Sequence, residues 1–243
     1  MSKVTTKGFG RLLLAALLLA ATQAVYAASA NSAGTVTLST GRATAADLDG
    51  NIRPLSRGDS VYQGELISTG PSSYLNIKFK DGGRILLRPN SRFEIEQFEF
   101  ESRPPPATGA QPQAPTPARQ ESAFFRLLKG GFRAVSGLIG RSDREDYRVR
   151  TPVATIGIRG TDFEARMCQG DCQDIDPVPP DGLYTGSVEG TIEVTNAEGK
   201  SIVRNPGQYA YIPPGPSDDP VGLRNRPRVL DQDPMPDPET CGD

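Results

Sequence analysis

The sequence contains no histidine and no tryptophan, and only three of its 243 residues are cysteine. Without histidine, the chain cannot build a site that needs an imidazole as general base or metal ligand. This absence excludes the Ser-His-Asp hydrolases and the zinc sites that use histidine. Serine–lysine and two-carboxylate mechanisms remain chemically open.

Long apolar runs are also scarce, and the longest lies near the beginning of the chain. The basic residues Lys3, Lys7 and Arg11 precede an apolar run over residues 12–24, and small residues suited to signal peptidase end at Ala27. This run is shorter than the roughly 20 residues that a spanning helix needs. We therefore predict that residues 1–27 are a cleaved signal peptide, with an uncleaved anchor as the alternative. The mature chain is expected to be periplasmic or secreted and to have no membrane span.

The charge balance argues against a nucleic-acid partner. The formal net charge is −2, and loss of the leader makes it more negative by three because the leader holds three basic and no acidic residues. Nucleic acid requires a basic face. A local excess of Lys and Arg from Arg126 to Arg150 is the exception. It indicates either a solvated strand face or a docking surface for an acidic partner.

Short segments with period-two alternation recur along the chain. Examples are Tyr74–Phe79, Phe93–Phe100 and Gly190–Thr195, and Asp81-Gly82-Gly83 supplies a hairpin turn after the first of them. This pattern predicts an all-β domain over residues 34–213. We expect many short strands that form a twisted sandwich or a short solenoid-like stack of sheets.

One apolar segment fits two kinds of structure. Residues 124–139 have the spacing of an amphipathic helix, but Gly130 and Gly131 lie in its centre. Each glycine destabilises a helix interior by roughly 1 kcal/mol relative to alanine. A strand from Leu127 through Val135 is therefore the favoured interpretation.

Two segments have the composition of disordered chain. Residues 103–120 are rich in Pro, Ala and Gln, and residues 214–243 are rich in Pro and Asp. The first is predicted to be a mobile Pro-rich insertion between two strands. The second is predicted to be a disordered acidic tail.

An acidic loop over residues 168–181 contains two of the cysteines. Cys168 and Cys172 are separated by three residues, which in an exported protein favours a small disulfide loop. A metal site is the weaker alternative, because two cysteines with only carboxylates nearby make an incomplete ligand set. Cys241 could pair with either of them or with another chain.

The segment Thr151-Pro152 to Phe163 has the most distinctive pattern. Small or β-branched residues alternate with polar ones until the pattern reaches Arg159-Gly160-Thr161. Glycine within a strand marks a bulge or a close backbone approach, so we predict a strand with a defined kink. We expect the Arg159 guanidinium to bind a buried carboxylate through paired hydrogen bonds, with ligand recognition as the alternative.

The acids near strong strand patterns show no catalytic arrangement. Glu94 and Glu96 share one strand face, as do Asp162 and Glu164. We interpret both pairs as the polar outer face of a half-buried strand. No catalytic residue, cofactor-binding residue or metal ligand is predicted.

An ordered series of short motifs resembles the FecR domain family. The matching features, in chain order, are Val36 with Gly41, Leu55–Gly58 with Gly64–Thr69, Asp81–Ile85, Pro89–Ser91, Leu128–Gly130, Thr151-Pro152, Arg159–Phe163, and Gly207-Gln208 before Tyr209. The resemblance implies a β-rich extracytoplasmic domain. In the family's namesake, this domain relays the signal of an outer-membrane iron-chelate receptor to a sigma factor.

The chain departs from that namesake at its beginning. The resemblance implies that the namesake has a short cytoplasmic segment and one membrane helix before its periplasmic domain. In this chain an export signal is expected in place of both. This departure argues against direct control of a sigma factor.

Two classes of function follow. The first is a non-catalytic domain that binds a protein or an envelope polymer, in a role that includes cell-envelope signalling. The alternative is a carboxylate-based glycan-active enzyme or a structural envelope protein. Two inward-facing carboxylates about 5–10 Å apart in a cleft would favour the enzyme.

Overall fold

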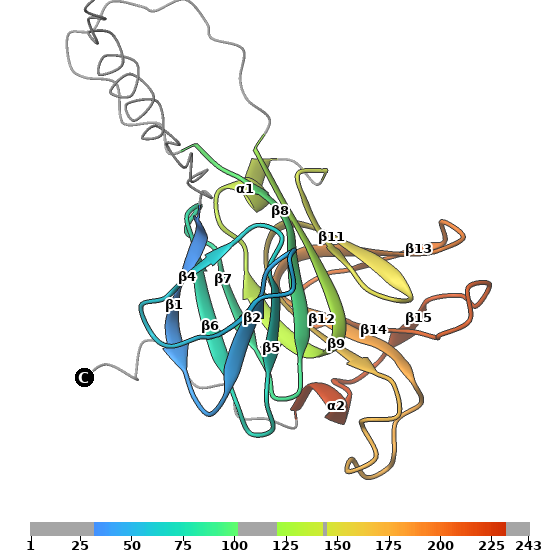
Figure 1. Ribbon diagram of the computed structural model, residues 1–243. Helices are drawn as coiled ribbons and strands as arrows, with labels where there is room; N and C mark the ends of the chain where they lie inside the picture. The colour runs from blue at the N-terminus through green and yellow to red at the C-terminus, as the bar shows by residue number, and fades with distance from the viewer. Residues whose placement is uncertain (1–31, 102–120, 143–144, 232–243) are drawn as a thin grey trace, which may run out of the picture. The chain divides into compact units, whose positions relative to one another are not determined.

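The computed structural model describes residues 32–101, 121–142 and 145–231 (Figure 1). All of them belong to one compact unit, Asn31–Asp243. The predicted signal peptide and the whole predicted Pro-rich insertion lie outside the described residues. No helix in the described ranges is long and apolar enough to cross a membrane.

The described chain is built almost entirely from strands. The elements are β1 Ser32–Ser39, β2 Ala43–Ala46, β3 Ile52–Pro54, β4 Ser60–Tyr62, β5 Leu66–Thr69, β6 Leu75–Phe79, β7 Arg84–Leu87, β8 Arg92–Glu99, β9 Ser122–Val135, α1 Ile139–Ser142, β10 Tyr147–Arg150, β11 Ala154–Cys168, β12 Gly182–Asn196, β13 Ser201–Arg204, β14 Tyr209–Ile212, β15 Val221–Leu223 and α2 Arg228–Asp231. The prediction of an all-β fold made of many short strands is confirmed. The predicted strand Leu127–Val135 is confirmed as part of β9, which begins five residues earlier, at Ser122.

Hydrogen bonds connect these strands into one open mixed sheet of 15 strands. Most pairings in the described chain are antiparallel, whereas β10 runs parallel to β9. Each of the long strands β9, β11 and β12 pairs with different neighbouring strands along its two halves (Figure 1). For example, the first half of β9 pairs with β8 and β10, and its second half pairs with β7 and β11.

The long strands bend where a glycine adopts a positive φ angle. In β11 the register shifts between Arg159 and Asp162, and Gly160 between them has φ +55°. Gly190 in β12 has φ +74° and packs directly against Gly160. Positive φ is accessible to glycine without the steric penalty of a Cβ. The kink predicted at Gly160 is therefore present, and it is shared by two neighbouring strands.

The bends bring the apolar faces of the sheet together into one core. Phe125 on β9 contacts Phe79 on β6, with ring centroids 5.1 Å apart, and Phe93 on β8, with ring centroids 5.4 Å apart. Phe132 on β9 contacts Phe163 on β11 edge to face at 5.4 Å. Aromatic contacts of this kind stabilise a core beyond the area they bury. Residues from both parts of the sheet thus belong to a single apolar cluster.

The segment after residue 213 differs from the expectation of a disordered tail. Residues up to 231 are described, and they include β15 and α2. Val229 and Leu230 are each only 1% exposed. Burial of these two apolar side chains opposes the disorder that the Pro- and Asp-rich composition suggests. Residues 232–243, including Cys241, lie outside the described ranges.

Candidate functional site

Thr151 and Pro152 form the turn that leads from β10 into β11. The Thr151 hydroxyl accepts a hydrogen bond from the backbone N–H of Ala154 at 3.0 Å and donates one to the carbonyl of Ala154 at 2.8 Å. The Pro152 side chain is exposed. This local pattern closes a hairpin, so these two motif residues shape the backbone.

Gly160, Thr161 and Phe163 hold the bulge of β11 in place. The N–H of Thr161 donates to the Ser136 hydroxyl at 2.9 Å, and the Thr161 hydroxyl donates to the carbonyl of Thr191 at 3.2 Å. Phe163 is fully buried in the core. The bulge is therefore joined to both of its neighbouring segments, and these residues have a structural role.

Arg159 does not occupy the position that the sequence predicted. Its side chain is exposed on the outer face of β11, because its neighbour Ile158 takes the buried face. Buried carboxylates are bound by other arginines instead, among them Arg88, whose partner is Glu164. The expectation of a structural Arg159 ion pair is therefore wrong, and strand alternation gives the reason.

The exposure of Arg159 leads to a testable result. We expect Arg159→Ala to change the free energy of unfolding by no more than about 0.5 kcal/mol, as exposed substitutions generally do. Chemical denaturation of the purified protein would measure this. A loss of several kcal/mol would show that the guanidinium has a structural partner.

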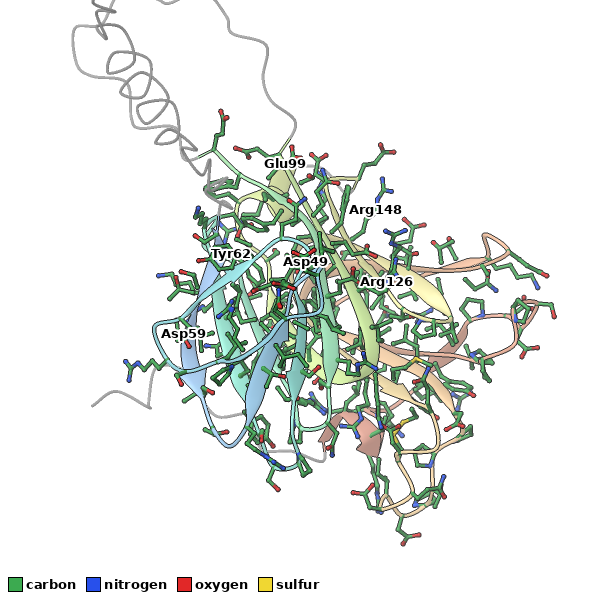
Figure 2. The ribbon with its side chains drawn as sticks, viewed as in Figure 1. Asp49, Asp59, Tyr62, Glu99, Arg126 and Arg148 are labelled. Atoms are coloured by element: carbon green, nitrogen blue, oxygen red, sulfur yellow. A yellow bond between two sulfur atoms is a disulfide. The ribbon has the colours of Figure 1, made fainter. Side chains whose placement is uncertain are left out.

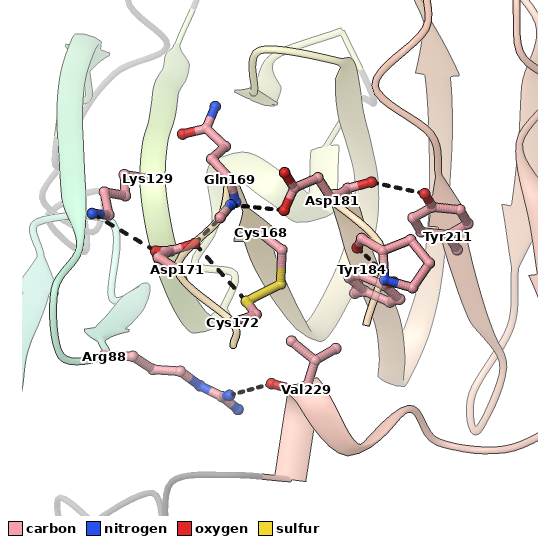
Figure 3. The surroundings of a disulfide bond; sticks show 12 residues. Arg88, Lys129, Cys168, Gln169, Asp171, Cys172, Asp181, Tyr184, Tyr211 and Val229 are labelled. Carbon is pink, nitrogen blue, oxygen red and sulfur yellow. Dashed lines mark hydrogen bonds and ion pairs between the residues drawn. A yellow bond between two sulfur atoms is a disulfide. The ribbon is translucent and has the colours of Figure 1, made fainter. Parts of the chain in front are cut away.

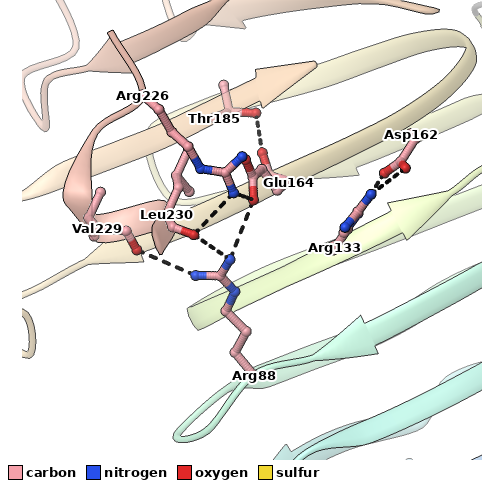
Figure 4. A network of polar contacts seen from close by, with 8 residues as sticks. All are labelled: Arg88, Arg133, Asp162, Glu164, Thr185, Arg226, Val229 and Leu230. Atoms are coloured by element: carbon pink, nitrogen blue, oxygen red, sulfur yellow. Dashed lines mark hydrogen bonds and ion pairs between the residues drawn. The ribbon is translucent and has the colours of Figure 1, made fainter. Parts of the chain in front are cut away.

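A buried ionic network lies where β7 ends and β11 passes beneath the C-terminal segment (Figure 4). Arg88 is 0% exposed and Glu164 is 1% exposed. Their side chains approach to 3.4 Å, and Arg226 binds the same Glu164 oxygen at 2.8 Å. Two guanidinium groups thus bind one oxygen of the same buried carboxylate.

Arg88 also ties the C-terminal segment to the sheet. Its guanidinium donates to the carbonyl oxygen of Leu230 at 2.8 Å and to that of Val229 at 3.4 Å (Figure 4). Arg226 lies over the ring of Tyr209, with 5.9 Å between its guanidinium carbon and the ring centroid. The polar contacts of these two arginines hold the α2 backbone over Glu164.

Sequence reasoning misses this network for a definable reason. The alternation of β11 places Glu164 on a solvent face together with Asp162. The half-buried Asp162 does form a surface pair with Arg133 at 2.7 Å. Glu164 lies two residues further along the same face, but α2 covers it there. The sequence does not indicate the burial of Glu164, because the composition of the segment that covers it predicts a disordered tail.

The other buried acids are also engaged in structural contacts. Glu65 binds Arg53 at 2.7 Å and accepts the N–H of Tyr62 at 2.8 Å. Burial raises the pKa of Asp81, while hydrogen bonds from the backbone of Gly83 and Ile139 oppose that rise. The described residues contain no cluster of His, Cys, Asp or Glu that could hold a metal ion.

Cys168 and Cys172 form a disulfide with an S–S distance of 2.05 Å (Figure 3). Both sulfur-bearing residues are buried beside Ile175, Tyr184 and the α2 residues Val229 and Leu230. The loop that follows is closed by a hydrogen bond from the N–H of Gly170 to Asp181 at 2.7 Å. The bridge therefore fixes the acidic loop beside the C-terminal segment.

Reduction of this bridge should have a modest effect on stability. For so short a loop, the chain-entropy model gives about 2 kcal/mol. We expect the Cys168→Ser, Cys172→Ser double variant to lose roughly that amount in chemical denaturation. Alkylation followed by intact-mass measurement provides the direct test. Cys168 and Cys172 should accept the reagent only after reduction, and labelling of both before reduction would contradict the bridge.

A shallow groove of about 350 Å³ lies between the acidic loop and α2. Its lining is mainly apolar and includes Ile175, Val178 and Val229. No carboxylate side chain contributes to the lining. The groove thus lacks the pair of carboxylates that glycan hydrolysis requires.

One protein family matches the central part of the chain. Residues 65–175 match the family model described as FecR protein. The resemblance stated from the sequence motifs is confirmed over this range. No curated protein sequence matches the chain.

Solved structures show only limited similarity. Two crystal structures described provisionally as an anti-sigma factor from Parabacteroides distasonis ATCC 8503 share 13% identity with this chain, with a TM-score of 0.45. The alignment covers 66% of this chain and 59% of theirs. A structure described as a cell surface anchoring domain shares 32% identity over 26% of this chain and 82% of its own length, with a TM-score of 0.25. TM-scores this low carry neither fold nor function across to this protein.

Proposed function

We propose that this chain is a non-catalytic extracytoplasmic domain that binds another protein and takes part in cell-envelope signalling. The observation that carries the proposal is that buried charged side chains form ion pairs within the fold. Arg88, Glu164 and Glu65 are engaged in holding the fold. The chemistry that remains available to another molecule lies on the outer surface.

The family match and the disulfide support the proposed class and compartment. The FecR match covers the centre of the fold, from β5 to the acidic loop. Disulfides persist in oxidising compartments such as the periplasm and are rare in the cytosol. The leader-like residues 1–27 agree with export. Cell fractionation together with the mass of the mature chain would test the location, and an uncleaved cytosolic chain would contradict it.

The enzymatic alternative gains no support from the described residues. A glycan hydrolase needs two carboxylates that face one cleft. Here Glu65 and Glu164 are each compensated by arginine, and Glu96 on the outer face binds Arg150.

Photo-crosslinking in intact cells would test the proposed binding role. A photoreactive amino acid is placed, one position at a time, at the exposed residues Leu138, Val188, Val203 and Val221. We expect at least one position to give a discrete protein adduct, whereas the buried control Ile158 gives none. An adduct that is removed by glycan hydrolases would identify a polymer partner instead. Absence of adducts at every exposed position of the folded protein would contradict the proposal.

A further inference from the structure

Four arginine side chains lie on the outer face of β10 and of the parts of β9 and β11 that pair with it or lie next to it. Arg126 lies on β9, Arg148 and Arg150 on β10, and Arg159 on β11. The residues that alternate with them point into the core, so the four side chains share the outer face. Figure 2 shows Arg126 and Arg148 close to one another over these strands.

Two of these arginines already bind a carboxylate on this face. Glu96 of β8 accepts hydrogen bonds from Arg150 at 2.9 and 2.6 Å. The same carboxylate forms an ion pair with Arg126. Arginine side chains of this surface thus bind a carboxylate within the folded chain, and a carboxylate of another protein could make the same kind of contact.

Arg148 and Arg159 lack such a carboxylate partner in the described chain. The guanidinium of Arg148 lies over the ring of Phe124, with 5.3 Å from its carbon to the ring centroid. Stacking on an aromatic face leaves the edge of a guanidinium able to donate hydrogen bonds. The side chain of Arg159 is exposed.

The strand register places these two arginines at a defined spacing. Arg148 lies opposite Gly157 on β11, and Arg159 is two residues beyond Gly157 on the same face. Such diagonal neighbours lie about 7–8 Å apart, with their Cβ atoms somewhat closer. The space above Gly157 is open, because a Cβ there would meet only the carbonyl oxygen of Glu193, at 3.9 Å.

We propose that Arg148 and Arg159 form a docking site for an extended acidic segment of a partner protein. In an extended peptide, residues i and i+2 lie roughly 6.6 Å apart on one side. Carboxylates at those two positions have a spacing similar to that of the strand positions of Arg148 and Arg159, and each can form paired charge-assisted hydrogen bonds with a guanidinium group. This inference rests on the proposed binding function and gives it a surface and a partner chemistry.

The surrounding charges favour a short protein segment over a long polyanion. Glu94 and Glu96 lie on β8 at one side of the arginines, and Glu193 lies on β12 at the other. A sulfated or phosphorylated polymer crossing this face would meet these acids, and the negative charge of Glu94 and Glu96 offsets the attraction of the arginines that they pair with. Two carboxylates on one short segment reach the arginines without crossing them.

Peptide binding to the full chain would test the site. The probe is a fluorescein-labelled peptide of Ser and Thr with two Glu residues at i and i+2, measured by anisotropy. The comparison peptide has the same composition but adjacent Glu residues, whose side chains point to opposite sides of an extended strand. We expect the Arg148→Gln, Arg159→Gln double variant to weaken binding of the i, i+2 peptide by about tenfold or more.

A charge-matched variant provides the control. Arg42 and Arg57 are exposed outside β9–β11, so Arg42→Gln with Arg57→Gln removes the same charge elsewhere. This control should change the affinity by less than about twofold. If both double variants weaken peptide binding equally, the effect comes from net charge alone, and the proposed site is wrong. Absence of binding, equal affinity for both peptides, or tighter binding of a sulfated glycan to the same arginines would also overturn it.

The crosslinking experiment separates this inference from the proposed function. A photoreactive residue in place of Arg148 should capture the same protein as the other exposed positions. Capture of a partner only through other faces would overturn the arginine site and leave the binding function standing. Absence of capture at all positions would contradict both.

Discussion

Gly190→Ala should destabilise the fold by more than about 4 kcal/mol, which lies beyond the usual range for single substitutions. A Cβ at this position would overlap the carbonyl oxygen of Gly160 and lie 2.9 Å from its carbonyl carbon and 3.0 Å from the Cα of Thr161. All of these atoms belong to backbone, so no side chain can turn aside. The positive φ of +74° adds strain to the steric overlap.

A second glycine separates the two contributions. Gly199 has φ +81°, but a Cβ there would meet nothing within 4 Å. Gly199→Ala should therefore lose only the roughly 1–3 kcal/mol that a strained backbone conformation costs. Chemical denaturation of both variants, with circular dichroism to confirm folding, gives the difference. Similar losses in the two variants would show that the paired bends of β11 and β12 are not closely packed.

The strand content was predictable because it depends on local patterns. The alternation of Tyr74–Phe79 and the Asp81–Gly83 turn became β6 and the hairpin that follows it. Gly160 gave a correct signal for the kink, since a glycine that interrupts a strand pattern marks a bulge or a close backbone approach. The continuity of one sheet through bent strands was not predictable, because it depends on pairing between segments far apart in the chain.

The buried ionic network shows where sequence reasoning failed. Arg159 stands beside the most distinctive motif, yet strand alternation turns it outward. Arg88 has no conspicuous local motif, and the pattern around its partner Glu164 is that of an ordinary polar strand face. The burial of both depends on α2, whose Pro- and Asp-rich surroundings suggest disorder. Long-range burial of a charged side chain thus leaves little trace in local composition.

Arg88→Met should lower the free energy of unfolding by about 3–5 kcal/mol, as removal of one partner from a buried ion pair does. Glu164 would remain buried and would keep its ion pair with Arg226, whose side chain is 38% exposed. The carbonyl oxygens of Val229 and Leu230 would also lose the hydrogen bonds from Arg88, and Leu230 would keep only a weaker one from Arg226 at 3.4 Å. We therefore expect α2 to lose hydrogen-exchange protection before the rest of the sheet does.

Two further variants decide whether burial of the charge is responsible. Arg133→Met breaks the ion pair with Asp162, in which the Arg133 side chain is 39% exposed. This variant should therefore lose no more than about 1 kcal/mol in the free energy of unfolding. Arg88→Met combined with Glu164→Met removes both buried charges and should recover a large part of the loss, because apolar replacement of a buried pair is often nearly neutral. If the double variant is as unstable as Arg88→Met alone, the carbonyl contacts to α2 carry the stabilisation. Arg88 would then act as a clamp on the C-terminal segment, with Glu164 serving only to compensate its charge.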